Sequence, residues 1–149
     1  MQIQSLLTPN RTLCCVELNS KRSALETLAR TLALDILGLD ADDLLRRFLA
    51  RERLGSTGIG HGIAIPHCRY PSNAGAVGAL ITLTAPIEFD AIDAEPVDIL
   101  FAMIVPEEAH DEHLKNLAIL ATKLSSDEYR QRLRNATDNQ ALYDAAIEL

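Results

Sequence analysis

A glycine-rich segment followed by a histidine is the part of this sequence best suited to chemistry. Four glycines fall between Gly55 and Gly62. Glycine allows tight turns and close approach of the main chain to a ligand, and successive exposed N–H groups form a concave anion site. The spacing matches neither the P-loop nor the dinucleotide-binding fingerprint. The segment therefore indicates either an anion site of another kind or a turn without a ligand.

His67 comes directly after residues 63–66, a short apolar run that ends in Pro66. Proline fixes its own φ and restricts the residue before it, so the chain that leads to the imidazole is stiff. A neutral imidazole nitrogen is a nucleophile near pH 7 and can accept a phosphoryl group. A lone histidine is more often an ordinary surface or core residue. Beside a glycine-rich anion site, His67 becomes a candidate phosphoryl acceptor.

Three further side chains bear on this site. Arg51 lies at the end of an expected helix just before the glycines, where its guanidinium could pair bidentately with a phosphoryl group. The alternative is an ordinary cation at a helix C-terminus, which the helix dipole favours. His110 and His113 lie at the start of another expected helix, where a neutral His113 could help to hold the phosphoryl group. For His110, an exposed first turn is the simpler interpretation.

Metal and thiol chemistry are the alternatives to phosphoryl transfer. The chain has four histidines but no HExxH or CxxC motif. The carboxylates around His110 and His113 are typical of the first turn of a helix. We therefore expect no metal site and rank a zinc hydrolase below phosphoryl transfer. Cys68 follows His67, but a thiol without an evident base is more often a small packing residue.

Two amphipathic helices are expected before the glycine-rich segment. Residues 20–37 carry apolar side chains at helical spacing, with Gly38 as the C-terminal cap. Residues 41–53 form the second helix, with Asp40 as its N-cap. A short strand over residues 13–18 is expected to precede both helices.

Two strands and three helices are expected after that segment. Residues 77–85 and 97–105 are almost continuously apolar and are each followed by proline, as in strands covered on both faces. Residues 114–124 carry an inward apolar stripe. Two further helices are predicted by capping boxes, which pair Ser125 with Glu128 and Thr137 with Gln140.

This order of elements predicts a three-layer α/β fold, with a mixed β-sheet flanked by helices on both faces. The sequence has no long linker, internal repeat or low-complexity tract. We therefore expect residues 1–149 to form a single domain.

Composition limits the partners that the chain can have. Its 149 residues include fourteen basic and twenty-one acidic side chains, for a formal net charge of −7. A protein that neutralises many phosphates needs the opposite balance, so we expect no nucleic acid partner. No run approaches the roughly 20 apolar residues that cross a bilayer, and the N-terminus does not resemble a signal peptide. We therefore expect no membrane insertion.

The three cysteines indicate a reducing compartment. Cys14 and Cys15 are adjacent and Cys68 stands alone, without the spacing of a disulfide framework. Adjacent cysteines rarely bridge each other, so the simplest interpretation is free thiols in a cytoplasmic protein.

Residues 51–67 closely resemble the active-site signature of the fructose/mannitol-type IIA components of the bacterial phosphotransferase system. Residues 89–98 and 113–118 resemble the same family in the same order. The likeness covers most of the chain and is greatest to the nitrogen-regulatory members. The sequence departs from the commonest pattern at Cys68, where the family often has glycine, and at His61, where it often has asparagine.

The resemblance implies a mechanism. His67 matches the residue that a histidine phosphocarrier of the HPr or NPr type phosphorylates, with phosphate that originates in phosphoenolpyruvate. Arg51 matches the family's active-site arginine, and His113 matches its second, non-phosphorylated histidine. No metal or organic cofactor is implied. A phosphate-cradling loop is expected, in which main-chain N–H groups stabilise the phosphoryl oxygens; its residues are Thr57, Gly58, Gly60 and Gly62.

We therefore predict a phosphoryl-accepting regulatory protein of the nitrogen phosphotransferase system, which carries phosphate on a histidine rather than turning over a substrate alone. Its expected regulated partner is a transporter or a sensor kinase. One alternative is a sugar-system subunit that passes phosphate from His67 to a IIB domain. Another is a regulatory binding module that acts independently of phosphate.

Overall fold

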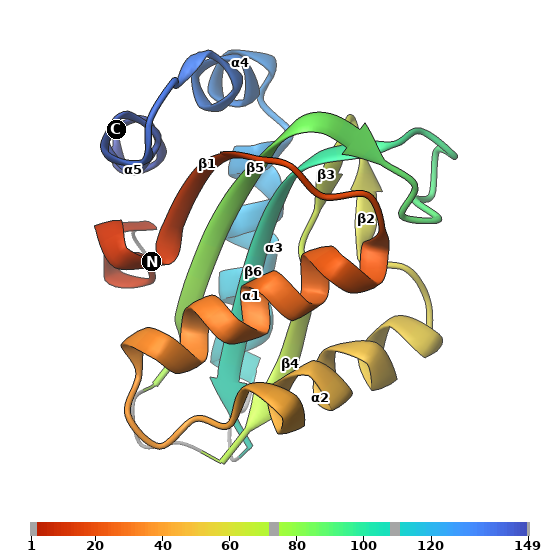
Figure 1. The fold of residues 1–149 in the computed structure, drawn as a ribbon, viewed down its shortest axis with the longest axis vertical. Helices are drawn as coiled ribbons and strands as arrows, with labels where there is room; N and C mark the ends of the chain where they lie inside the picture. The colour runs from red at the N-terminus through yellow and green to blue at the C-terminus, as the bar shows by residue number, and fades with distance from the viewer. Residues whose placement is uncertain (1–2, 72–74, 108–110, 149) are drawn as a thin grey trace.

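A mixed β-sheet forms the middle layer of the computed structural model, which describes residues 3–71, 75–107 and 111–148, and only the backbone of residues 111–114. The six strands of this described part run in the order β1-β5-β6-β3-β2, and β4 also pairs with β6 (Figure 1). Strands β5 and β6 are antiparallel, whereas β1, β3 and β4 each run parallel to their long neighbour. The strands are β1 (Thr12–Val16), β2 (Gly58–Gly60), β3 (Ile63–Ala64), β4 (His67–Tyr70), β5 (Val77–Ile87) and β6 (Val97–Pro106).

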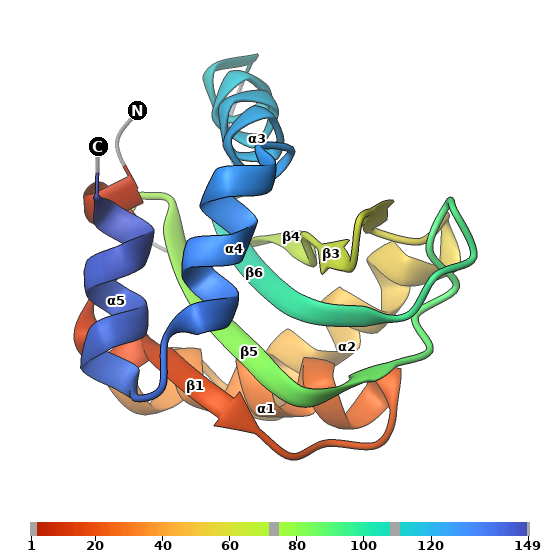
Figure 2. The same ribbon diagram turned by 90° about the horizontal axis from the view of Figure 1, so that it is seen from above.

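Helices cover both faces of this sheet, which confirms the predicted architecture. The first face carries α1 (Lys21–Asp35) and α2 (Ala41–Arg53). Figure 2 shows the C-terminal helices on the opposite face. These are α3 (Asp111–Leu124), α4 (Asp127–Asn135) and α5 (Asn139–Ile147), and two short 3-10 turns, Ile3–Ser5 and Pro9–Arg11, precede β1.

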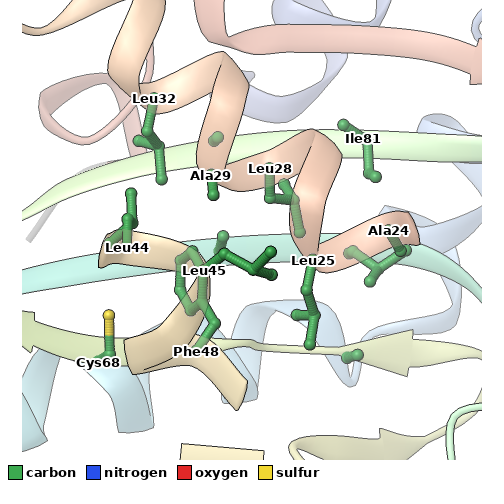
Figure 3. Close-up of a cluster of buried hydrophobic side chains, with 14 of the residues drawn as sticks. Ala24, Leu25, Leu28, Ala29, Leu32, Leu44, Leu45, Phe48, Cys68 and Ile81 are labelled. Carbon is green, nitrogen blue, oxygen red and sulfur yellow. The ribbon is translucent and has the colours of Figure 1, made fainter. Parts of the chain in front are cut away.

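The two long strands are almost continuously apolar because their alternate side chains fill two separate cores. Along β6, Leu100, Ala102 and Ile104 pack into the core that α1 and α2 cover. The intervening side chains, Ile99, Phe101 and Met103, pack into the core beneath α3, α4 and α5. Figure 3 shows the first core, in which the apolar stripes of α1 and α2 meet the sheet.

The boundaries of α2 match the prediction, whereas those of α1 do not. Asp40 caps α2 by accepting a hydrogen bond from the backbone N–H of Asp43. Helix α1 ends at Asp35, and its C-cap is Ile36 rather than Gly38. Gly38 has a φ of +91°, but it takes this conformation in the turn beyond the helix. Leu37 is fully exposed, so no packing extends the helix.

The N-caps of the last two helices each lie one residue later than predicted. Ser126 caps α4 by accepting from the N–H of Tyr129, and Asp138 caps α5 by accepting from Ala141. The hydroxyl of Ser125 instead donates to the carbonyl of Thr122, so this residue closes the preceding helix α3.

The strands differ from the prediction in extent and in number. Strand β5 continues through Pro86 to Ile87, because the ladder to β6 is irregular between Thr82 and Ile87 and needs no N–H from the proline. The short strands β2, β3 and β4 were not predicted. Each has only two to four residues, too few to show a period.

Candidate functional site

His67 is the first residue of β4 and is half-buried beside the end of α2. Its Nδ1 lies 2.8 Å from the carbonyl oxygen of Ile65. The Nε–H of Arg51 donates to Nε2 of the ring at 3.3 Å. A guanidinium can only donate, so Nε2 must hold a lone pair, and Nδ1 carries the proton that the Ile65 carbonyl accepts. These contacts select one tautomer and leave Nε2 as the nucleophilic nitrogen.

The surroundings of His67 keep its ring neutral. Burial lowers the pKa of His67 below its ordinary value of 6.5, and the positive charge of Arg51 lowers it further. The bond to Ile65 and the charge of Glu52 act in the opposite direction without cancelling these effects. The imidazole is therefore uncharged at pH 7.

Arg51 bridges His67 and the turn that follows α2. Its Nη1–H donates to the carbonyl oxygen of Gly55 at 2.8 Å, while its Nε–H reaches the ring of His67. These bonds use two of the five N–H donors of a guanidinium. A permanent positive charge thus lies next to the nucleophilic nitrogen, which is where a phosphoryl group would need stabilisation.

Glu52 is a functional candidate that the sequence analysis missed. Its side chain is only 5% exposed, and it pairs with Lys21 Nζ at 2.8 Å. It also accepts from the backbone N–H of Thr57 at 3.1 Å and from the Thr57 hydroxyl. Glu52 therefore ties the end of α2 to the glycine-rich segment and to the start of α1. In the sequence, Glu52 stands next to Arg51 and five residues before Thr57 of the glycine-rich segment. This position is the signal that could have identified Glu52 as a candidate.

The N–H groups at the start of the expected phosphate loop are bonded within the protein. The N–H of Thr57 donates to Glu52, and that of Gly58 donates to the hydroxyl of Ser56 at 3.0 Å. Gly58 and Gly60 lie in the short strand β2. A phosphate-binding role for this segment stays a prediction.

Close packing against distant segments explains two of the glycines. A Cβ on Gly58 would lie 2.7 Å from the Cβ of Ala91. Gly62 has a φ of +79°, and a Cβ there would lie 2.5 Å from Nη2 of Arg134 and 2.8 Å from Oδ1 of Asp98. These positions need glycine for space and, at Gly62, also for backbone conformation.

The other histidines and Cys68 differ in what can be said of them. His110 lies outside the described residues. His113 lies in the first turn of α3, but its side chain also falls outside them, so its supporting role stays a prediction. His61 has an exposed side chain and a φ of +59°, and its backbone N–H donates to Asp93. Burial raises the pKa of Cys68 to about 12, so its thiol stays protonated and packs in the core.

The described residues contain neither a cluster of metal ligands nor a membrane-spanning helix. Within residues 3–71, 75–107 and 115–148, no three or more His, Cys, Asp and Glu side chains come together in a way that could hold a metal ion. In the described part of the chain, every helix is too short or too polar to span a bilayer.

The arrangement of His67 and Arg51 suits acceptance of a phosphoryl group. The lone pair on Nε2 is a nucleophile, and the adjacent guanidinium is an anion stabiliser that needs no proton transfer. The same elements, with α2 delivering the arginine and β4 the histidine, form a mixed sheet between two helical layers.

Comparison with known proteins defines the class. The family model described as phosphoenolpyruvate-dependent sugar phosphotransferase system, EIIA 2, matches residues 5–148. The chain therefore belongs to this EIIA family. It is 42% identical over 149 residues to a nitrogen regulatory protein of Pseudomonas aeruginosa, covering 100% of this chain and 97% of that protein.

Two solved structures share the fold. The crystal structure of the nitrogen regulatory protein IIA-Ntr from Neisseria meningitidis gives a TM-score of 0.89 at 35% identity, covering 97% of this chain and 98% of that chain. The mannitol IIA enzyme of Escherichia coli, in its complex with phosphorylated mannitol IIB, gives a TM-score of 0.75 at 16% identity, with 94% and 96% covered. The first likeness extends to sequence, whereas the second is one of fold alone.

Proposed function

We propose that this protein is a phosphoryl-accepting regulator of the nitrogen branch of the phosphotransferase system, phosphorylated at Nε2 of His67 by a carrier of the HPr or NPr type. The observation that carries the proposal is a neutral imidazole whose Nε2 lone pair faces Arg51 at 3.3 Å. Membership of the EIIA family and the likeness to nitrogen regulatory proteins support it.

The transfer needs placement more than covalent help. Nε2 of His67 attacks the phosphorus, and the bond between phosphorus and the carrier's imidazole nitrogen breaks with its electron pair left on that nitrogen. The His67 ring gains positive charge, which the carbonyl of Ile65 stabilises through Nδ1–H. Arg51 occupies the approach to Nε2, so it moves aside and then donates to the phosphoryl oxygens.

Phosphorylation of His67 is tested with phosphoenolpyruvate, enzyme I and the carrier. We expect the intact protein to gain the mass of one phosphate, in an acid-labile form. His67→Ala should gain none, because the accepting nitrogen is lost. His61→Asn is the matched control, since His61 has an exposed side chain and asparagine tolerates its positive φ. No mass gain in the wild type, or an undiminished gain in His67→Ala, would contradict the proposal.

The regulatory role is tested separately from the chemistry. The baits are the phosphorylated protein, the unphosphorylated protein and His67→Ala. We expect a transporter or a sensor kinase to be retained differently by the phosphorylated bait than by the other two. Equal retention by all three would favour a binding module that acts independently of phosphate.

Delivery of phosphate to a IIB domain is the second candidate, because the mannitol IIA enzyme of the same fold is seen with phosphorylated IIB. Rapid loss of phosphate to IIB domains from the same organism would favour delivery over regulation. Retention of phosphate in their presence is the result we expect.

A further inference from the structure

Cys14 and Cys15 hold their sulfur atoms in contact at the edge of the sheet. Successive side chains of a regular strand point to opposite faces, which separates adjacent thiols. In β1, Cys15 has a φ of +56°, and the pairing with β5 shifts between Leu13 and Val16. As a result both thiols turn to the same side, and the two Sγ atoms lie 3.0 Å apart.

Neighbouring groups hold this pair in place. The backbone N–H of Cys14 donates to Oδ1 of Asn139 at 2.7 Å, and that of Cys15 donates to the hydroxyl of Thr82 at 3.0 Å. Both sulfurs approach one carbonyl oxygen, that of Ala136, at 3.2 Å from Cys14 and 3.8 Å from Cys15. The left-handed backbone at Cys15 and the shared acceptor, the carbonyl of Ala136, therefore hold the two thiols next to each other.

The two thiols differ in access. Cys15 is exposed and Cys14 is partly buried. Burial, together with the hydrogen bond to Cys15, raises the pKa of Cys14 to about 11. Cys15 is therefore placed to react first with a reagent from solvent, and Cys14 is placed to react second with whatever is attached to its neighbour.

We propose that Cys14 and Cys15 form a thiol–disulfide exchange site, which a small-molecule disulfide such as oxidised glutathione converts reversibly into a vicinal disulfide. The Cys15 thiolate attacks one sulfur of the oxidant, forms a mixed disulfide and releases one glutathione thiol. The Cys14 thiolate then attacks Sγ of Cys15 and expels the second glutathione thiol. The two cysteines lose two protons and two electrons, and the oxidant is reduced to two thiols.

The bond formed in this way is expected to be easy to reduce. Adjacent Cα atoms lie only about 3.8 Å apart, whereas disulfides usually join Cα atoms about 4.4–6.8 Å apart. Strained and exposed disulfides are the labile ones that suit regulation rather than structure. Strands β5 and β6 separate β1 from β4, so this site lies away from His67.

The test exposes the reduced protein, residues 1–149, to oxidised and reduced glutathione at several ratios, followed by alkylation and intact mass measurement. We expect the wild type to become two hydrogen atoms lighter, with only Cys68 alkylated after unfolding, and excess reduced glutathione should reverse the change. Cys14→Ser should stop at a mixed disulfide carrying one glutathione. Cys68→Ser and His67→Ala should close the bond as the wild type does.

A wild-type protein that keeps three free thiols, stops at the mixed disulfide or forms only disulfides between chains overturns the proposal. Because His67→Ala is used alongside, failure here is independent of whether His67 accepts phosphate.

Discussion

At the scale of single residues, two contacts fix the tautomer of the His67 ring. The carbonyl of Ile65 holds the proton on Nδ1, and the guanidinium of Arg51 lies at Nε2. In the described part of the chain, no carboxylate is bonded to the ring to act as a general base. None is needed, because burial already keeps the imidazole neutral, and a neutral imidazole carries its own lone pair.

We expect NMR titration to place the pKa of His67 below 6.5. Burial lowers this pKa more than the charge of Arg51 does. Arg51→Gln should therefore raise the pKa of His67 only part of the way back to 6.5. The folded-state pKa is depressed, so the stability that this histidine contributes is complete above pH 6.5 and is lost as the pH falls below it.

The same Arg51→Gln variant should slow phosphorylation on the order of 100-fold, because the cation that donates to the phosphoryl oxygens is lost. Arg53 is an exposed cation in the last turn of the same helix. Arg53→Gln is therefore the control and should change neither the pKa of His67 nor the rate of phosphorylation. A titration midpoint of 6.5 or higher in the wild type would show that the ring is not kept neutral by its surroundings.

At the scale of elements, the site depends on segments that hold β2, β3 and the end of α2 in place. Arg134 of α4 donates to the carbonyl of His61 at 2.8 Å and to both carboxylate oxygens of Asp98, at 2.8 and 3.0 Å. On the other side, Glu52 joins α2 to Thr57. Arg134 of α4 therefore holds the turn between β2 and β3 from the helical layer opposite α2. Gly62 leaves the space for this contact.

Two alanine substitutions, one at this turn and one just before β5, separate the cost of backbone conformation from the cost of packing. Gly62 and Gly75 have φ values of +79° and +74°. Among the described residues, an added Cβ would have neighbours within 4 Å at Gly62 and none at Gly75. Gly75→Ala should cost about 1–2 kcal/mol, the penalty for a left-handed alanine. Gly62→Ala should cost about 0.5–1.5 kcal/mol more, because Arg134 must give up a hydrogen bond.

Urea unfolding of the two variants and the wild type measures this difference. Equal losses of stability in the two variants would mean that the contact between Arg134 and the turn contributes nothing. A larger loss in Gly75→Ala would contradict the packing argument outright.

At the scale of the whole molecule, one sheet supports two apolar cores. Side chains of β5 and β6 enter both, so neither helical layer has a sheet of its own. Leu28 of α1 and Leu133 of α4 are fully buried in opposite cores. The molecule should therefore unfold as one unit, and a single domain over residues 1–149 stays a prediction.

Leu28→Ala and Leu133→Ala should each cost about 2–5 kcal/mol and should each shift one shared unfolding transition. Circular dichroism follows the helices, and hydrogen exchange of peptides from α1 and α4 follows each layer. Two transitions, each sensitive to only one of these substitutions, would divide the chain into two units.

Elements with local signals could be predicted from the amino-acid sequence. Helix α2 was predicted with its observed bounds and its N-cap Asp40, because a cap and an apolar stripe involve residues only a few positions apart. The buried strands β5 and β6 were recognisable from their continuous apolar runs. The motif from Arg51 to His67 likewise lies in one continuous segment, and it pointed to the family.

Features that depend on contacts between distant residues emerged only in the folded chain. Nothing near Glu52 in the sequence shows that Lys21 neutralises it. Nothing near Gly62 shows that Arg134 packs on it. The tautomer of His67 depends on its contact with Arg51 of α2, and the orientation of the Cys15 thiol depends on the irregular pairing of β1 with β5. Such contacts form only when the chain folds, because they join groups that no sequence period brings together.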